Sequence, residues 1–506
     1  MNSTHQPLNR RRLTTAALVF TIIAASAPLT VLAGGVPTNY AVAGLLGVPQ
    51  AYLVLGLLLV VFAVGYTAMS RHVQNAGAFY AYVTEGLGPR QGIGAAILAL
   101  VSYNMMQIGL YGLFGFAGAN LLAEFTGITL SWWVVALAGW ILVAILGVNS
   151  IDLSAKVLGV IVILEFVAVI VVDVISLGSA PEGLSTEAFA ADQFFTPGIG
   201  ILLSFGIAAF MGFESGAIYS EEVVDPRRTV ARATYIAVSI IALFYAFSAW
   251  AFAVGIGPSA VVEQSRQHGP DLVFVWLGSF SPLLANLVNF LFVTSLIAVL
   301  LAFHNAAARY FFSLGRSNVL PKFLGKTNKS GAPSHGSLAQ SALALIVVIG
   351  FIIAGIDHPL GELFPVITLF TWLTNSAAFG LVFLMAITSI AVLVWFRKTP
   401  QGLGIGTRVI APTIAAVGLS MVFILILANF DLMIEAESGS SLIFIMPGII
   451  IGSGIAGFIW GEVIRRRRPE TFELMKVQDQ IPDEEEEAIA AAAGVKPPVN
   501  DNSFRM

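Results

Sequence analysis

A single carboxyl group, Glu214, interrupts a long apolar stretch of this chain. It directly follows Phe210, Met211, Gly212 and Phe213 within residues 197–222, a stretch long enough to cross a bilayer. At that depth a carboxyl group must be paired, protonated or facing water, and such groups commonly serve function. Glu214 can accept a ligand ammonium or a coupling proton. The alternative is bracing, in which its oxygens bind backbone amides freed by a break in the helix.

A second deep carboxyl group, Glu165, lies midway along residues 153–177. It is nine residues from Lys156, about 13 Å along a helix, so the two side chains cannot pair directly. Its partner must therefore come from another span. Glu165 is either part of a proton path or the acceptor of a structural hydrogen bond. Asp152 and Lys156 stand four residues apart and can pair on one helix face.

The composition requires a membrane environment. Of the 506 residues, 57% are hydrophobic and only 11% are charged, whereas soluble domains carry about 25% charged residues. The chain has no cysteine, which excludes disulfides, cysteine metal sites and thiol catalysis. A nucleotide-binding loop of the GxxxxGK[ST] type is also missing, so we expect neither an ATP-driven pump nor an enzyme.

Hydropathy predicts an all-α membrane protein with twelve transmembrane helices. The first could imitate a secretory signal peptide, but eleven further apolar runs follow it. The sixth is expected to open with Thr196 as N-cap and Pro197 as first helical residue. The predicted spans are 13–36, 48–70, 93–122, 131–149, 153–177, 197–222, 229–256, 282–314, 337–356, 362–396, 409–429 and 441–464.

The basic residues predict the orientation. With twelve spans, 24 of the 25 Lys and Arg residues fall on one side, and only Arg266 falls on the other. Basic loops are retained in the cytoplasm, so both termini are expected there, with the chain in the plasma (inner) membrane. Residues 1–12 form an N-terminal tail. Residues 465–506 form an acidic C-terminal tail that is too polar to fold alone.

Two spans carry signs of a broken helix. Span one contains Ser26-Ala27-Pro28 and span six contains Gly212-Phe213-Glu214, five spans later. An odd offset inverts the second copy in the membrane, and paired broken helices indicate an inverted-repeat transporter with its site at the breaks. Gly and Pro also occur in ordinary membrane helices, which is the alternative explanation of either break.

Several blocks resemble the amino acid–polyamine–organocation (APC) family of transporters. The resemblance implies a transporter domain of residues 13–464, with two inverted five-helix repeats, discontinuous helices one and six, and two added helices. The repeats would cover 13–177 and 197–396, and helices eleven and twelve 409–464. The blocks that carry it are 75–82 with 87–92, 151–157, 212–233 and 304–321.

The sequence departs from the family at the first break. Many relatives have glycine-serine-glycine there, whose amides hold a substrate carboxylate. This chain has Ala25-Ser26-Ala27-Pro28, and proline has no amide hydrogen. An amine without a carboxylate thereby becomes a credible substrate. Asp152 stands where many relatives have a basic residue linked to proton coupling, so that role would pass to Lys156.

The candidate residues fall into three groups. Ordinary packing is the alternative for the aromatic residues, and solvated salt bridges are the alternative for the loop charges. The substrate candidates are Ala25, Ser26, Ala27, Phe210, Met211, Gly212, Phe213, Glu214, Asn104 and Trp372; the proton-coupling candidates are Glu214, Glu165 and Lys156; the cytoplasmic gate candidates are Glu221, Glu222, Arg228 and Arg232.

These features predict a secondary transporter (permease) that imports amino acids by alternating access, driven by proton symport. The alternative from the same family is an importer or exchanger of polyamines or other putrescine-like amines. A channel would not need two broken helices, and a membrane-embedded sensor should carry a folded soluble domain. We expect no cofactor, no metal and no nucleic acid; the expected partners are the lipid bilayer, a small amino compound and the proton.

Overall fold

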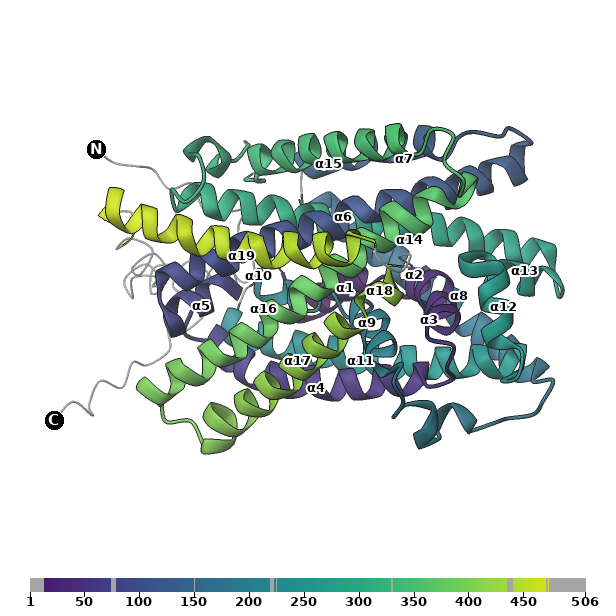
Figure 1. Cartoon of the computed structure of the whole chain (residues 1–506), viewed down its shortest axis with the longest axis horizontal. Coiled ribbons are helices and arrows are strands. Elements are labelled where there is room, and N and C mark those ends of the chain that lie inside the picture. Colours follow the sequence, from purple (N-terminus) through teal and green to yellow (C-terminus); the bar gives the residue numbers. More distant parts are fainter. Residues whose placement is uncertain are drawn as a thin grey trace.

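A computed structural model describes residues 13–73, 79–149, 151–218, 223, 225–328, 331–434, 440–469 and 472. Within these residues the regular structure is helical, apart from one isolated parallel bridge between Leu13 and Val223. Most helices run along the long axis of the molecule, and both termini lie at the same end of it (Figure 1). The chain folds as the predicted all-α bundle.

Eleven helical stretches of the described chain are long and apolar enough to cross a membrane, so this is a multi-pass membrane protein. Each corresponds to a span predicted from hydropathy. They are Thr15–Ala43 (α1 Thr15–Ser26, α2 Pro28–Thr30, a π-helical turn Val31–Gly35 and α3 Val36–Ala43), α4 Val48–Ser70, α6 Pro89–Thr126, α7 Trp132–Asn149, α8 Ile151–Ser179, α11 Pro226–Ile256, α14 Pro282–Arg316, α15 Ser334–Ala354, α16 Thr371–Lys398 with the π-helical turn Pro365–Phe370 before it, α17 Ala411–Ala428 after the π-helical turn Gly406–Ile410, and α19 Leu442–Arg467.

The remaining predicted span, 197–222, is divided into two short helices, α9 Ile199–Ala208 and α10 Ser215–Ile218. The expected start at Thr196 and Pro197 was wrong, because the Thr196 hydroxyl accepts the amide of Gly198 in a turn and the helix begins at Ile199. Residues 219–222 lie outside the described chain. Hydropathy therefore predicted the position of this segment, but the local turn determines the residue at which its helix begins.

Short helices also occur in connections that the sequence analysis treated as loops. All four of these helices are short and therefore carry no long apolar signal. Figure 1 places α12 and α13 at the end of the molecule opposite the termini. The short helices are α5 Phe79–Leu87, α12 Val261–His268, α13 Leu272–Gly278 and α18 Phe430–Met433.

Helix α6 forms the centre of the bundle. It packs along α14, α16 and α19, while α11 packs along α4, α8 and α1. Small residues permit close approach of membrane helices. At Gly56 of α4, for example, an added Cβ would come within 2.2 Å of the Ala242 Cβ of α11. The interrupted helix and the divided pair contact both groups of helices: α1 contacts α11 and α14, and α9 (Ile199–Ala208) contacts α4 and α16.

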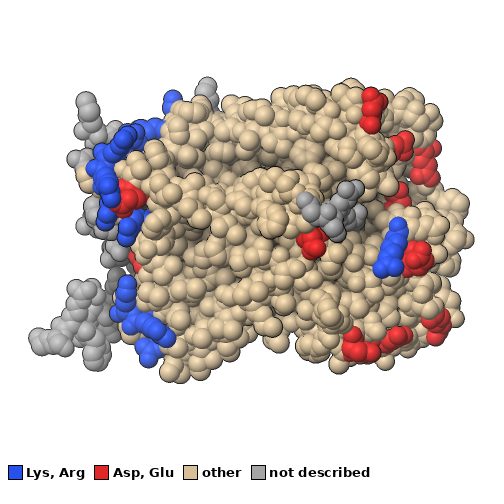
Figure 2. Space-filling model, in the orientation of Figure 1, with Lys and Arg blue, Asp and Glu red and all other residues tan. Residues whose placement is uncertain are grey.

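Charged side chains are separated between the two ends of the molecule. Figure 2 shows Lys and Arg gathered at the end that carries the termini, and mostly Asp and Glu at the opposite end. The wide band between them is almost free of charge on the visible face. An uncharged band between two charged ends is what a bilayer requires.

Candidate functional site

The first break lies at Ala27. Helix α1 ends at Ser26, and Ala27 adopts a left-handed backbone with φ of 43°, a conformation that costs a non-glycine residue roughly 1–2 kcal/mol. Its amide still donates to the Ile23 carbonyl at 2.9 Å, and its carbonyl accepts the Val31 amide at 3.0 Å. The helix therefore kinks at Ala27 rather than separating fully.

The second break lies between α9 and α10. Residues 209–214 form turns, and Gly212 has φ of 97°, which glycine alone adopts readily. A Cβ added to Gly212 would stand 2.4 Å from the Cβ of Ala25. The two breaks therefore touch each other, and the contact between Ala25 and Gly212 leaves no room for a larger side chain.

Glu214 braces the second break from within. Its Oε2 accepts the Gly212 amide at 3.0 Å, and its Oε1 accepts the hydroxyl of Tyr103 on α6. The Tyr66 hydroxyl of α4 donates to the Glu214 backbone carbonyl at 3.2 Å. The side chain is 2% exposed. Both hydrogen bonds to the carboxyl group therefore come from neutral donors, as the bracing interpretation requires. The carboxyl group can also take up a proton.

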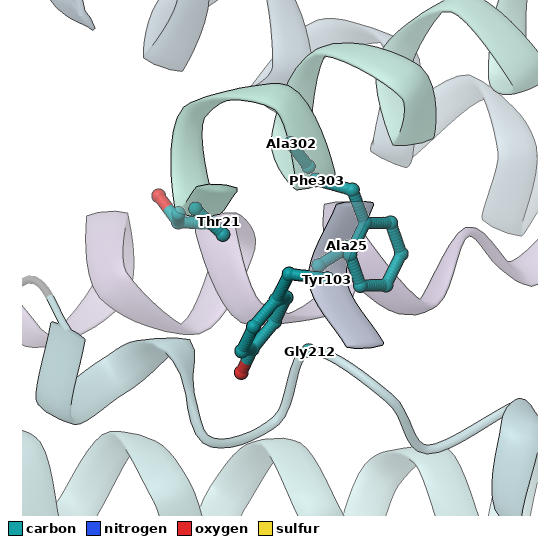
Figure 3. Close-up of a pocket in the computed structure, with 7 residues that line it drawn as sticks. Thr21, Ala25, Tyr103, Gly212, Ala302 and Phe303 are labelled. Carbon is teal, nitrogen blue, oxygen red and sulfur yellow. The ribbon is translucent and has the colours of Figure 1, made fainter. Parts of the chain in front are cut away.

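Two small cavities adjoin the breaks, each with room for about one water molecule. Figure 3 shows Tyr103 between the helix that carries Thr21 and Ala25 and the loop that carries Gly212, and Phe303 projecting toward Ala25 from the helix that carries Ala302. The second cavity is bordered by Phe210, Met211, Phe213 and Glu214 with other residues. The first is lined by Thr21, Ala25, Tyr103, Gly212, Ala302, Phe303 and Ala306.

Residues of two further helices, α11 and α8, bond to the first break. The Ser26 hydroxyl forms a 2.6 Å hydrogen bond with the hydroxyl of Tyr245 on α11. Glu165 of α8 is fully buried, and its Oε2 accepts the Leu29 amide at 3.3 Å. As expected, the partner of Glu165 comes from another span. It is a backbone amide of span one.

Other predicted residues lie apart from the two cavities. Asn104 is buried on α6 and bonds the Leu100 carbonyl at 2.7 Å. The Trp372 indole donates to the Ile434 carbonyl at 3.0 Å, and neither side chain lines a cavity. Arg228 and Arg232 are exposed on α11. Glu221 and Glu222 lie outside the described residues, and so does the side chain of Lys156.

Three tyrosines at the breaks were missed: Tyr66, Tyr103 and Tyr245. Each is at most 2% exposed and bonds a residue of a broken helix. A buried tyrosine hydroxyl usually finds a polar partner. Tyrosines inside apolar spans were therefore an available signal, although the sequence does not say which partner each one reaches.

Comparison with known proteins matches this architecture to one family. The sequence model of the family described as amino acid permease matches residues 18–473. The chain belongs to the amino acid permease family. It is 24% identical to the uncharacterized amino acid permease YtnA of Bacillus subtilis, over 67% of this chain and 72% of that protein.

The names of other relatives give different substrates. Identity is 24% to the histidine permease HisP of Lactococcus lactis, over 60% of this chain and 65% of that protein. It is 22% to the low-affinity putrescine importer PlaP of Escherichia coli, over 60% of this chain and 67% of that protein. Amino acid and amine carriers thus both occur among the relatives of this permease.

Substitution of Gly212 by Ala is expected to destabilise the protein by about 2–4 kcal/mol, because it combines an unfavourable φ with overlap on Ala25. Thermal unfolding of the purified protein measures the effect. Gly350→Ala is the matched control, since a Cβ there meets no atom within 4 Å. Equal melting temperatures for the two variants would contradict the contact between the breaks.

Proposed function

We propose that this permease is a secondary active transporter that imports a small amino compound by alternating access, together with a proton. The observation that carries the proposal is the meeting of two interrupted helices at a buried carboxyl group, Glu214. Interrupted helices leave backbone groups free to bind a ligand at mid-membrane depth, and they supply hinges at the same place. Membership of the amino acid permease family supports the substrate class.

Alternating access suits the packing at the breaks. The two cavities there are too small for an amino acid, so a ligand can enter only if the halves of the broken helices move apart. Gly212 and Ala27 already hold positive φ values. Backbone positions of this kind can absorb the change in φ and ψ when a helix half swings outward.

The surroundings of Glu214 support the proposal of proton coupling. As an anion it accepts two hydrogen bonds, from Tyr103 and from the Gly212 amide. A protonated carboxyl group accepts more weakly and can itself donate. Taking up a proton would therefore loosen the bond to Gly212 and favour opening of the break. Glu165 is the second candidate for this role, and Lys156 remains a weaker one on the family resemblance.

The proposed orientation places both termini in the cytoplasm and the permease in the plasma membrane. Support comes from the charge distribution, because the end that carries the termini is rich in Lys and Arg (Figure 2). We also propose that Arg228 and Arg232, with Glu221 and Glu222, act as a gate at that end. Both arginines are exposed, so their side chains can form ion pairs with new partners when the gate closes.

The orientation is tested with single cysteines, which the natural chain lacks. A membrane-impermeant maleimide added to whole cells should label Gln267→Cys, on α12, and should spare Lys398→Cys, at the end of α16. Both positions are exposed, so each serves as the accessibility control for the other after lysis. Labelling of Lys398→Cys alone in intact cells would overturn the orientation.

Substitution of Glu214 by Gln is expected to abolish the response of uptake to a pH gradient, because the amide cannot take up the coupling proton. Uptake into proteoliposomes is measured with the radiolabelled amino compound that most stabilises the purified protein in a thermal-shift screen. Tyr103→Phe is the matched control: it removes a hydrogen bond to Glu214 but keeps the carboxyl group.

The Tyr103→Phe variant should be slower but still respond to the gradient. If Glu214→Gln retains a normal response, Glu214 has a bracing role only. If uptake requires sodium and ignores the proton gradient, proton coupling itself is wrong.

A further inference from the structure

Three consecutive residues at the first break, Ala27, Pro28 and Leu29, offer no free amide. The Ala27 amide donates to Ile23. Pro28 has no amide hydrogen. The Leu29 amide donates to the carboxylate of Glu165. In transporters with broken helices, free amides at such a break are the groups that receive an anionic part of the substrate. In this chain, a carboxylate from α8 already occupies that position.

The second oxygen of the same carboxyl group, Oε1 of Glu165, is buried and forms no hydrogen bond of normal geometry. The hydroxyl of Ser295 on α14 is close enough to interact with this carboxyl group. Among the described residues no basic side chain pairs with Glu165 or with Glu214. A buried carboxylate without a cation is strongly unfavourable, and an ammonium group beside it removes most of that penalty.

The two carboxyl groups lie on either side of the contact between the breaks. Glu214 binds Gly212, which touches Ala25, and Glu165 binds Leu29, four residues beyond Ala25 on span one. If both carboxyl groups are ionised, an amino acid would bring a further carboxylate into this region and leave their negative charge uncompensated. A cationic amine would bring the charge that the region lacks.

We propose that the substrate of this permease is an organic amine without a carboxylate, and that Glu165 takes the place of the substrate carboxylate at the Leu29 amide. Oε2 of Glu165 holds the amide, and Oε1 accepts the ammonium group of the amine. This inference rests on the proposed function and narrows its substrate class. The hydroxyl groups of Ser26 and Tyr245, which bond to each other beside the break, complete a polar and acidic surface.

The inference is tested with pairs of compounds that differ only in the carboxylate. The full-length purified protein is titrated with lysine and cadaverine, ornithine and putrescine, and histidine and histamine, and thermal stabilisation gives the affinities. At least one amine should bind tenfold or more tightly than its parent acid. If every acid that binds does so as tightly as its amine, the inference is overturned and the transport function stands.

Variants of Glu165 test the assigned contacts. Glu165→Gln keeps an acceptor for Leu29 but removes the charge, so amine affinity should fall at least tenfold. Glu165→Ala should free the Leu29 amide and shift the preference toward the parent acid. Asp173→Asn is the matched control, because Asp173 is a buried carboxyl group on the same helix and bonds Ser248 instead.

Each outcome for the variants decides one point. Unchanged amine affinity in Glu165→Gln, or an equal loss in Asp173→Asn, removes Glu165 from recognition of the amine. The wild-type comparison remains decisive if the Glu165 variants fail to fold. If none of the six compounds binds and none enters proteoliposomes, the proposed function fails, and the inference fails with it.

Discussion

A backbone amide that leaves its helix inside a bilayer must find an acceptor within the protein, because the hydrocarbon offers none and each unsatisfied group costs several kcal/mol. Both interrupted helices of this permease meet that requirement with a carboxylate. Glu214 accepts the amide of Gly212 in span six, and Glu165 accepts the amide of Leu29 in span one. The breaks thus persist because carboxyl groups that accept these amides are buried beside them.

The two broken helices contact each other at two places. They touch where Gly212 meets Ala25, and they are joined again where Leu13, just before α1, pairs with Val223 after span six. Their polar partners lie on other helices: Tyr103 on α6, Tyr245 on α11 and Glu165 on α8. A change of protonation or the arrival of an ammonium group at either carboxylate therefore alters contacts with several helices at once. These linked contacts would provide a physical basis for the proposed coupling of a proton to helix movement.

The sequence predicted the apolar spans well, because bilayer thickness imposes a length that hydropathy detects directly. The sequence also predicted the positions of both breaks, because a proline follows Ser26-Ala27 and a glycine stands two residues before Glu214. It did not predict that Tyr103 bonds Glu214, that Tyr245 bonds Ser26, or which amide Glu165 reaches. Those contacts join residues more than 100 positions apart, and their pairing depends on how the helices pack. The helix start at Ile199 was missed because Thr196 and Pro197 form a turn with the usual signals of a helix start.

We propose that a proton moves inward with the substrate through the region of Glu214. A pH-sensitive dye trapped in lightly buffered proteoliposomes, without an imposed gradient, tests this proposal. External addition of the transported compound should acidify the interior at a rate proportional to its uptake. Uptake of the labelled compound with no change in internal pH would contradict the account.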